Sequence, residues 1–253
     1  MATASNRTAT EVETKRNTER RFFTGMALGM ICISFLAFIP SIAHPAERRA
    51  PLSALAAAHG LVFFAWLLVF LIQSRLIATH RVAIHRRLGL ASIVILALMI
   101  PLAYTTTIAM VRRGYDLSGD LSIGINNELA LETVFPLANL LIFTTLAIAA
   151  LAYRFRPEIH KRLMLFANIE LMPAPLAHLI GHTPWLSLLP AAIVMVPIAV
   201  FVLAAVGRDL LVARRIHPLT WGLAILRIIS GPLEAGPIRT SAVWHHFVYW
   251  LAR

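Results

Sequence analysis

Histidines inside apolar stretches are the residues of this chain with the clearest capacity for chemistry. His59, His178 and His182 each lie within a run of hydrophobic residues. Axial binding of a b-type haem needs two imidazoles that face the iron from opposite sides, and separate helices can supply them at equal depth. His59 with His178, or with His182 in its place, is the outer candidate pair. His178 and His182 also share a helix face at a four-residue spacing, which suits a transition metal.

A second pair of histidines belongs to a junction that occurs twice. Residues 85–89 (HRRLG) return as residues 160–164 (HKRLM), and in both copies an arginine lies four residues before the histidine. His85 and His160 are therefore candidates for an inner haem pair on the opposite membrane face. A basic junction of this kind also anchors a span to anionic lipid and sets its orientation without chemistry, and this is the interpretation we favour.

Carboxyl, hydroxyl and amide groups add to the polar content of the apolar runs. With a helical rise of about 1.5 Å per residue, Tyr104 and Glu132 fall at the depth of His59. Glu132 and His59 could complete a zinc or copper site. Three further polar residues lie deeper: Glu170, Asn168 and Asn139. Because an ionisable group at that depth is functional by default, we expect Glu170 to be a neutral acid or a partner of Asn168. No catalytic residue is assigned.

The elements that must position these side chains are transmembrane helices. Hydrophobic residues make up 58% of the 253 residues and charged residues 14%, with a mean hydropathy of +0.75, whereas soluble domains carry about a quarter charged residues. Runs of about 20 apolar residues recur, and each is long enough to cross about 30 Å of hydrocarbon as a helix. The expected fold class is an all-α, polytopic transmembrane helical bundle.

Three regions divide the chain. Residues 1–20 are polar and lack apolar periodicity, so we expect a disordered cytoplasmic tail. Residues 21–240 are expected to form the transmembrane helical domain. Residues 241–253, with Trp244, Phe247 and Trp250, suit an amphipathic helix that lies at the membrane interface. Seven spans are expected in the helical domain, at about residues 22–43, 53–76, 86–111, 129–153, 158–181, 185–207 and 217–233.

Lysine and arginine residues between the spans predict the orientation. If the N-terminus is inside, the inner segments hold 16 of these residues and the outer segments 6, which is the asymmetry of the positive-inside rule. The C-terminus is then outside, in a bacterial inner membrane. Spans 2–3 and spans 4–5 become two related hairpins, each with one copy of the repeated junction at the cytoplasmic start of its second span.

The same charge distribution indicates which classes of partner to expect. The net charge of +11 is carried by short loops, so the positive-inside rule explains it and nucleic acid is not an expected partner. The lipid bilayer is the expected partner, and both a larger membrane complex and a homo-oligomer remain open. Cys32 is the only cysteine, which excludes an intramolecular disulfide and a cysteine-based zinc site.

The two junctions and their surroundings resemble families of predicted bacterial inner-membrane proteins of unknown function. The residues that carry this resemblance lie between about 55 and 180: Ala58, His59, Gly60, Gln73, Arg75, and the repeated stretches 85–89 and 160–164. It extends weakly to Trp221, Gly222 and Trp244. A fainter similarity to transmembrane di-haem cytochromes lies in the histidines near both faces, although His85 and His160 here begin their helices. The resemblance implies the fold class and no assigned activity.

Two classes of function remain open for such a protein. In the first, the protein is redox-linked and its intramembrane histidines bind haem b or a transition metal. In the second, it is a non-catalytic transport, sensing or accessory subunit that binds a small solute, a quinone or a lipid. The optical spectrum and the metal content of the purified protein separate them, because haem gives a Soret band and the non-catalytic class predicts a colourless, metal-free sample. The residues do not decide whether the protein is an enzyme.

Overall fold

The protein is helical throughout the part of the chain that its structure describes. The computed structural model describes residues 2–48, 50–113, 117, 119, 133–183 and 191–252, and no strand occurs among them. The elements are α1 (Ala2–Ala43), η1 (Pro45–Glu47), α2 (Ala54–Ala78), α3 (Val82–Arg113), α5 (Val134–Ala152), α6 (Pro157–Ile169), α7 (Pro173–Gly181), η2 (Ala191–Val194), α8 (Met195–Ala213), α9 (Pro218–Leu233), the π-helical η3 (Glu234–Ile238) and α10 (Ala242–Ala252). The all-α class predicted from composition is confirmed.

Six candidate membrane spans are present among these described residues. They are Glu13–Ala43, Ala54–Ala78, Val82–Arg113, Val134–Ala152, Pro157–Gly181 and Met195–Ala213, each long and apolar enough to cross a bilayer. The seventh predicted span corresponds to α9, which has 16 residues. At about 1.5 Å per residue, a helix of that length reaches about 24 Å and is shorter than a typical hydrocarbon core.

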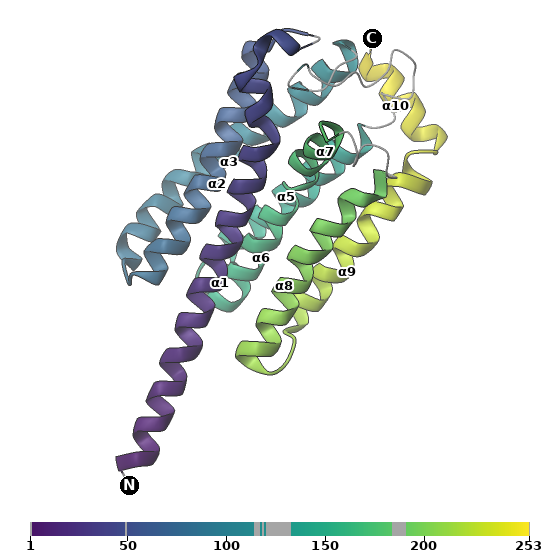
Figure 1. The fold of residues 1–253 in the computed structure, drawn as a ribbon. Helices are drawn as coiled ribbons and strands as arrows, with labels where there is room; N and C mark the ends of the chain where they lie inside the picture. The colour runs from purple at the N-terminus through teal and green to yellow at the C-terminus, as the bar shows by residue number, and fades with distance from the viewer. Residues whose placement is uncertain are drawn as a thin grey trace.

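The spans run alongside one another, and consecutive spans alternate in direction, with α6 and α7 together forming one of them (Figure 1). Within the bundle α2 packs on α3, and α5 packs on α6, while α3 and α5 join the two pairs. On the other side α1 contacts α2, α7 and α8, and α8 lies beside α9. The end of α1 that carries the N-terminus extends past the other helices, and α10 lies at the opposite end near the C-terminus (Figure 1).

The span formed by α6 and α7 is the centre of the bundle. In its most apolar stretch 61% of the residues are buried, against 33% or less in each of the other five spans. Large side chains pack closely around it: Phe166 is buried, and Trp66 meets the buried Phe143 edge to face at 5.7 Å between ring centroids. A helix surrounded by other helices has no lipid-facing side, so its polar residues must find partners within the protein.

The structure differs from the prediction of a disordered tail over residues 1–20. Helix α1 begins at Ala2 and continues without interruption into the first span. Ion pairs stabilise part of this helical segment. Glu19 of α1 pairs with Lys161 of α6 and with Arg208 of α8. Composition alone gave no sign of these partners, which are far away in sequence.

The C-terminal helix has two different faces, as an amphipathic helix requires. Val248 and Leu251 of α10 are buried, whereas Val243 and Trp250 are exposed. The rings of Trp244, Phe247 and Trp250 follow one another at centroid distances of 5.4 and 6.3 Å. Its location at the membrane interface stays a prediction.

Candidate functional site

A break in the central span places a carboxyl group in the interior of the bundle. Helix α6 ends at Ile169, and Glu170 follows it directly. Helix α7 starts at Pro173, since proline fits the first turn of a helix, where its missing N–H is not needed. Glu170 lies at this break with only 2% of its surface exposed. A carboxyl group buried so deeply needs a partner within the protein.

The partner of Glu170 is the arginine of α9. The Nε atom of Arg227 lies 3.5 Å from Oε1 of Glu170, and its Nη1 donates a hydrogen bond of 2.8 Å to the hydroxyl of Ser230. Arg227 is as buried as Glu170. The contact with Glu170 shows that this arginine pairs with an acid inside the bundle.

A second buried carboxyl group lies close to the same arginine. Glu234 is the first residue of the π-helical turn η3 and is 3% exposed. It interacts with Ser230 and with the charge of Arg227, and its own charge acts on Glu170. Its Oε1 atom has no hydrogen-bond partner among the described residues. Single π-helical turns occur frequently at functional sites.

These residues form a group that we call the carboxyl cluster: Glu170, Arg227, Ser230 and Glu234. It contains two carboxyl groups and one guanidinium group, so it is electrically neutral only when one carboxyl group holds a proton or a cation joins it. An unbalanced charge inside a bilayer is costly. The cluster therefore has the composition of a site that holds a proton or accepts a hydrogen-bonding ligand.

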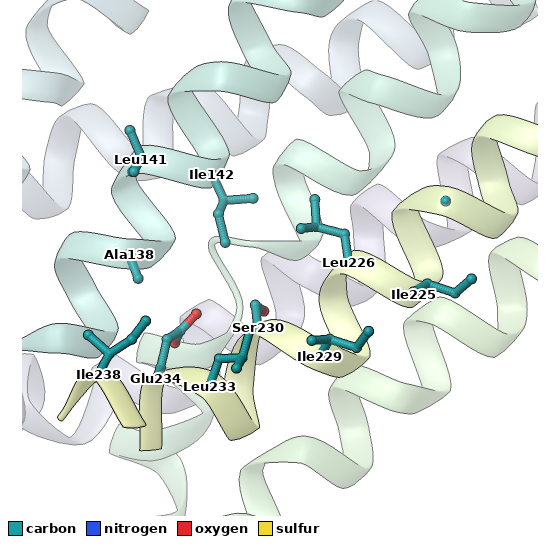
Figure 2. Close-up of a pocket in the computed structure, with 11 residues that line it drawn as sticks. Ala138, Leu141, Ile142, Ile225, Leu226, Ile229, Ser230, Leu233, Glu234 and Ile238 are labelled. Carbon is teal, nitrogen blue, oxygen red and sulfur yellow. The ribbon is translucent and has the colours of Figure 1, made fainter. Parts of the chain in front are cut away.

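An apolar groove runs along α5 and α9, and two residues of the carboxyl cluster, Ser230 and Glu234, line it (Figure 2). Its volume is about 490 Å³, within the range of small-molecule sites. Eleven residues line it: Ala138, Leu141, Ile142, Gly222, Ile225, Leu226, Ile229, Ser230, Leu233, Glu234 and Ile238. Figure 2 shows Ser230 and Glu234 close together on the α9 side, with aliphatic side chains along the rest of the groove.

The groove has the chemistry of a site for an amphiphile. Gly222 lies near the start of α9 and Glu234 follows its end, and a separation of 12 positions corresponds to about 18 Å of helix. Leu141 and Ile225 are exposed on its walls, as expected for side chains that face hydrocarbon. A long apolar chain fits along these walls, and a polar group fits beside Glu234.

The outer histidines of the sequence prediction have different neighbours. His59 stacks on Phe63 with 4.1 Å between ring centroids, and its Nδ1 lies 3.2 Å from the Thr106 hydroxyl of α3. His178 instead lies against α1, where its Nδ1 is 2.8 Å from the carbonyl oxygen of Ala37. Their pairing across a haem stays a prediction that these neighbours do not support.

The other predicted outer residues are His182, Tyr104 and Glu132. The ring of His178 on α7 lies 4.4 Å from the ring of His182, which directly follows the last residue of that helix. Tyr104 is exposed on α3. Glu132 lies outside the described residues. In the described part of the chain, no group of three or more His, Cys, Asp or Glu side chains is arranged to hold a metal ion.

The deeper amides do not join Glu170. Asn168 is fully buried, and its Nδ2 donates a hydrogen bond of 2.8 Å to the carbonyl oxygen of Met164. The Oδ1 atoms of Asn168 and Asn139 have no hydrogen-bond partner within the described ranges. The expectation that Asn168 pairs with Glu170 is therefore wrong, because the guanidinium group of Arg227 takes that place.

The inner histidines come close together. The rings of His85 and His160 have centroids 6.4 Å apart and are nearly perpendicular, at 86°. His85 is the fourth residue of α3 and His160 the fourth residue of α6. The repeated junctions, 75 residues apart in the chain, therefore meet at one end of the bundle.

A network of charges that the sequence did not indicate lies at the end of the bundle where α8 and α9 connect. Arg162 of α6 donates hydrogen bonds to Asp209 of α8 at 2.7 and 3.4 Å and to Thr220 of α9 at 3.0 Å. Asp209 is 1% exposed and also accepts from the Thr220 hydroxyl at 2.6 Å and from Arg208 at 2.6 Å. Glu19 and Lys161 extend the network to α1. We call these residues the ionic network.

His217 lies next to the ionic network, and the pH dependence of stability tests its role. The Nδ1 atom of His217 accepts a hydrogen bond from the N–H of Leu219 at 3.1 Å and so caps α9. Burial lowers the pKa of His217 below its ordinary value of 6.5, and the charge of Arg162 lowers it further. The unfolded chain therefore binds the proton first as the pH falls. The contribution to stability is complete above the unfolded pKa and is lost below it.

We expect the melting temperature of the protein in detergent to fall between about pH 7.5 and about pH 5.5, partly because of His217. Asparagine also caps helices well and does not titrate. The variant His217→Asn should therefore show a smaller fall over the same range. Equal pH dependence in the two proteins would contradict this role for His217.

No family model, curated protein or solved structure matches the chain. The class of the protein is therefore defined by its helices. It is an integral, multi-pass α-helical membrane protein whose described residues include six candidate spans.

Proposed function

We propose that this protein is a bacterial inner-membrane protein that binds a lipid-soluble molecule in the groove between α5 and α9. The observation that carries the proposal is the position of Glu234. Its buried carboxyl group lacks a hydrogen-bond partner at Oε1 among the described residues and lines an otherwise aliphatic groove. A buried polar atom without a partner costs free energy, and a ligand with a hydrogen-bonding head group removes that cost.

The chemistry of the groove favours the non-catalytic class of function. A protonated Glu234 donates to a carbonyl oxygen, as in a quinone or an ester, and an ionised Glu234 accepts from a hydroxyl or amine group. Both kinds of head group occur on molecules with long apolar chains. The protein then serves as a transport, sensing or accessory subunit, alone, as a homo-oligomer or in a larger membrane complex.

Native mass spectrometry of the protein released from mild detergent tests this proposal. We expect a fraction of the wild-type protein to carry one additional molecule. The variant Ile229→Trp fills the groove and should reduce that fraction about tenfold, which corresponds to about 1.4 kcal/mol. Glu234→Leu should also reduce it, and this variant leaves Glu170 and Arg227 as a balanced pair.

The matched control is Ile228→Trp, because Ile228 precedes Ile229 on α9, is 58% exposed and does not line the groove. This variant should retain the additional molecule at the wild-type level. Equal loss in the variants at 228 and 229 would indicate a general effect on detergent or lipid and would contradict a specific groove. Absence of any bound molecule from wild type in several detergents would also contradict it.

The proposal includes the orientation inferred from the basic residues. The N-terminus is cytoplasmic, and α9 makes a short seventh crossing that the π-helical turn η3 extends, so the C-terminus is outside. The two hairpins are copies of one unit, as the repeated junctions at residues 85–89 and 160–164 suggest. A C-terminal alkaline phosphatase fusion should be active and a C-terminal green fluorescent protein fusion dark, since phosphatase requires the periplasm. The reverse result would place the C-terminus inside.

A further inference from the structure

The two repeated histidines have the separation of a pair that shares one metal ion. A transition metal binds an imidazole nitrogen at about 2.0 Å, so two imidazoles on opposite sides of one ion have ring centroids roughly 6 Å apart. The centroids of His85 and His160 are 6.4 Å apart. Two aromatic rings in direct edge-to-face contact are often closer, as Trp66 and Phe143 are at 5.7 Å although the indole is the larger ring.

The backbone around each histidine holds its ring in place. The Nδ1 atom of His160 lies 2.7 Å from the carbonyl oxygen of Ala150, in the last turn of α5. The ring of His85 also interacts with the backbone of the preceding helix, at Gln73 of α2. Each histidine thus contacts the preceding helix of its own hairpin. Histidines that bind metals usually donate their other N–H to a carbonyl group in this way, which fixes the tautomer and the direction of the ring.

The remaining nitrogen atoms are available as ligands. If Nδ1 of His160 donates to Ala150, its Nε2 carries the lone pair. On the other ring, Nδ1 of His85 is buried and has no hydrogen-bond partner among the described residues. An unpaired nitrogen next to a second imidazole is the arrangement that a cation would complete.

We propose that His85 and His160 together bind a transition-metal ion at the end of the bundle where the two hairpins meet. The two imidazoles supply two ligands, and no third His, Cys, Asp or Glu joins them in the described part of the chain. The other coordination positions are filled from outside the protein, by water for a bare ion or by the ring nitrogens of a porphyrin. His85 and His160 are the two protein ligands in both cases, a bare ion and a haem iron.

Metal content and absorbance of the same sample distinguish a bare metal ion from a haem iron. The protein should be purified with an affinity tag that contains no histidine, after expression in medium with iron, copper, zinc and a haem precursor. We expect about one metal ion per chain by elemental analysis. A Soret band identifies haem iron, and copper or zinc without that band identifies a bare ion.

Three variants connect the metal to the histidines. His85→Ala and His160→Ala should each lower the metal content at least about tenfold, because both ligands are required. His80→Ala is the matched control, since His80 lies in the exposed turn between α2 and α3 and should retain the metal. Loss of metal in all three variants, or retention in all three, would overturn the proposal.

Metal binding can also be tested on the wild-type protein, which does not depend on the folding of any variant. For a protein isolated without metal, one equivalent of copper(II) can be added, and pulsed electron paramagnetic resonance then counts the coupled imidazoles. Two imidazoles are expected. One imidazole or none would overturn the proposal, as would a protein that neither contains nor binds any of these metals.

Discussion

Arg227→Met is expected to destabilise the protein by about 3–5 kcal/mol, the usual cost of removing one partner of a buried ion pair. Without the guanidinium group, Glu170 and Glu234 remain as two buried carboxyl groups with no cation beside them. Both must then bind protons or be hydrated inside the bundle. The melting temperature in detergent should fall by roughly 10 °C, since about 1 kcal/mol corresponds to about 2–4 °C for a protein of this size.

Glu170→Gln is the matched variant for this prediction. It removes one negative charge and leaves Arg227 with Glu234 as a balanced pair. Because the shape and hydrogen-bonding capacity of the side chain are retained, we expect a loss of less than about 1.5 kcal/mol. If Arg227→Met and Glu170→Gln had equal effects, the charge balance assigned to the carboxyl cluster would be wrong.

Asp209→Leu is expected to have a comparable effect at the other end of the bundle. Asp209 is almost completely buried and accepts hydrogen bonds from Arg162, Arg208 and Thr220. Its removal leaves two largely buried guanidinium groups close together without their shared acceptor. We expect a loss of about 3–5 kcal/mol, measured as the melting temperature by size-exclusion chromatography after heating.

A double-variant cycle shows whether this loss comes from the pair. Arg162→Met removes one of the two cations, so the double variant Arg162→Met with Asp209→Leu should be more stable than the sum of the single effects predicts. Arg215→Met is the control, because Arg215 is exposed in the adjacent loop and should change stability by less than about 0.5 kcal/mol. Additive effects of the two buried variants would contradict direct coupling between Arg162 and Asp209.

The fold class follows from the sequence because the bilayer imposes a simple rule on it. A segment that crosses hydrocarbon must satisfy its backbone hydrogen bonds internally and be apolar over about 20 residues. That rule located most of the helices within a few residues, but the span predicted at residues 185–207 is found at Met195–Ala213. It could not find the break after Ile169, because a helix interrupted for three residues has the same hydropathy as a continuous one. It also could not find the helical form of residues 2–20, part of which is secured by contacts of Glu19 with distant residues.

The site was predictable only in part, for a related reason. Glu170 was identified because a carboxyl group deep in a span is costly wherever it lies. Its partner was not, since contacts between separate helices leave no periodic pattern in the sequence. Glu234 was missed because it follows the last residue of the predicted seventh span. The sequence did identify His85 and His160 as a candidate pair, because the junction that contains them occurs twice.

An experimental structure of the protein in lipid nanodiscs, with a rigid antibody fragment bound for size, tests the central claim most directly. The account predicts density for a non-protein molecule between α5 and α9, with a polar atom within hydrogen-bond distance of Oε1 of Glu234. The density should be absent from the variant Ile229→Trp. A groove closed by direct packing of α5 on α9, with Oε1 of Glu234 hydrogen-bonded to another residue of the chain, would contradict the account.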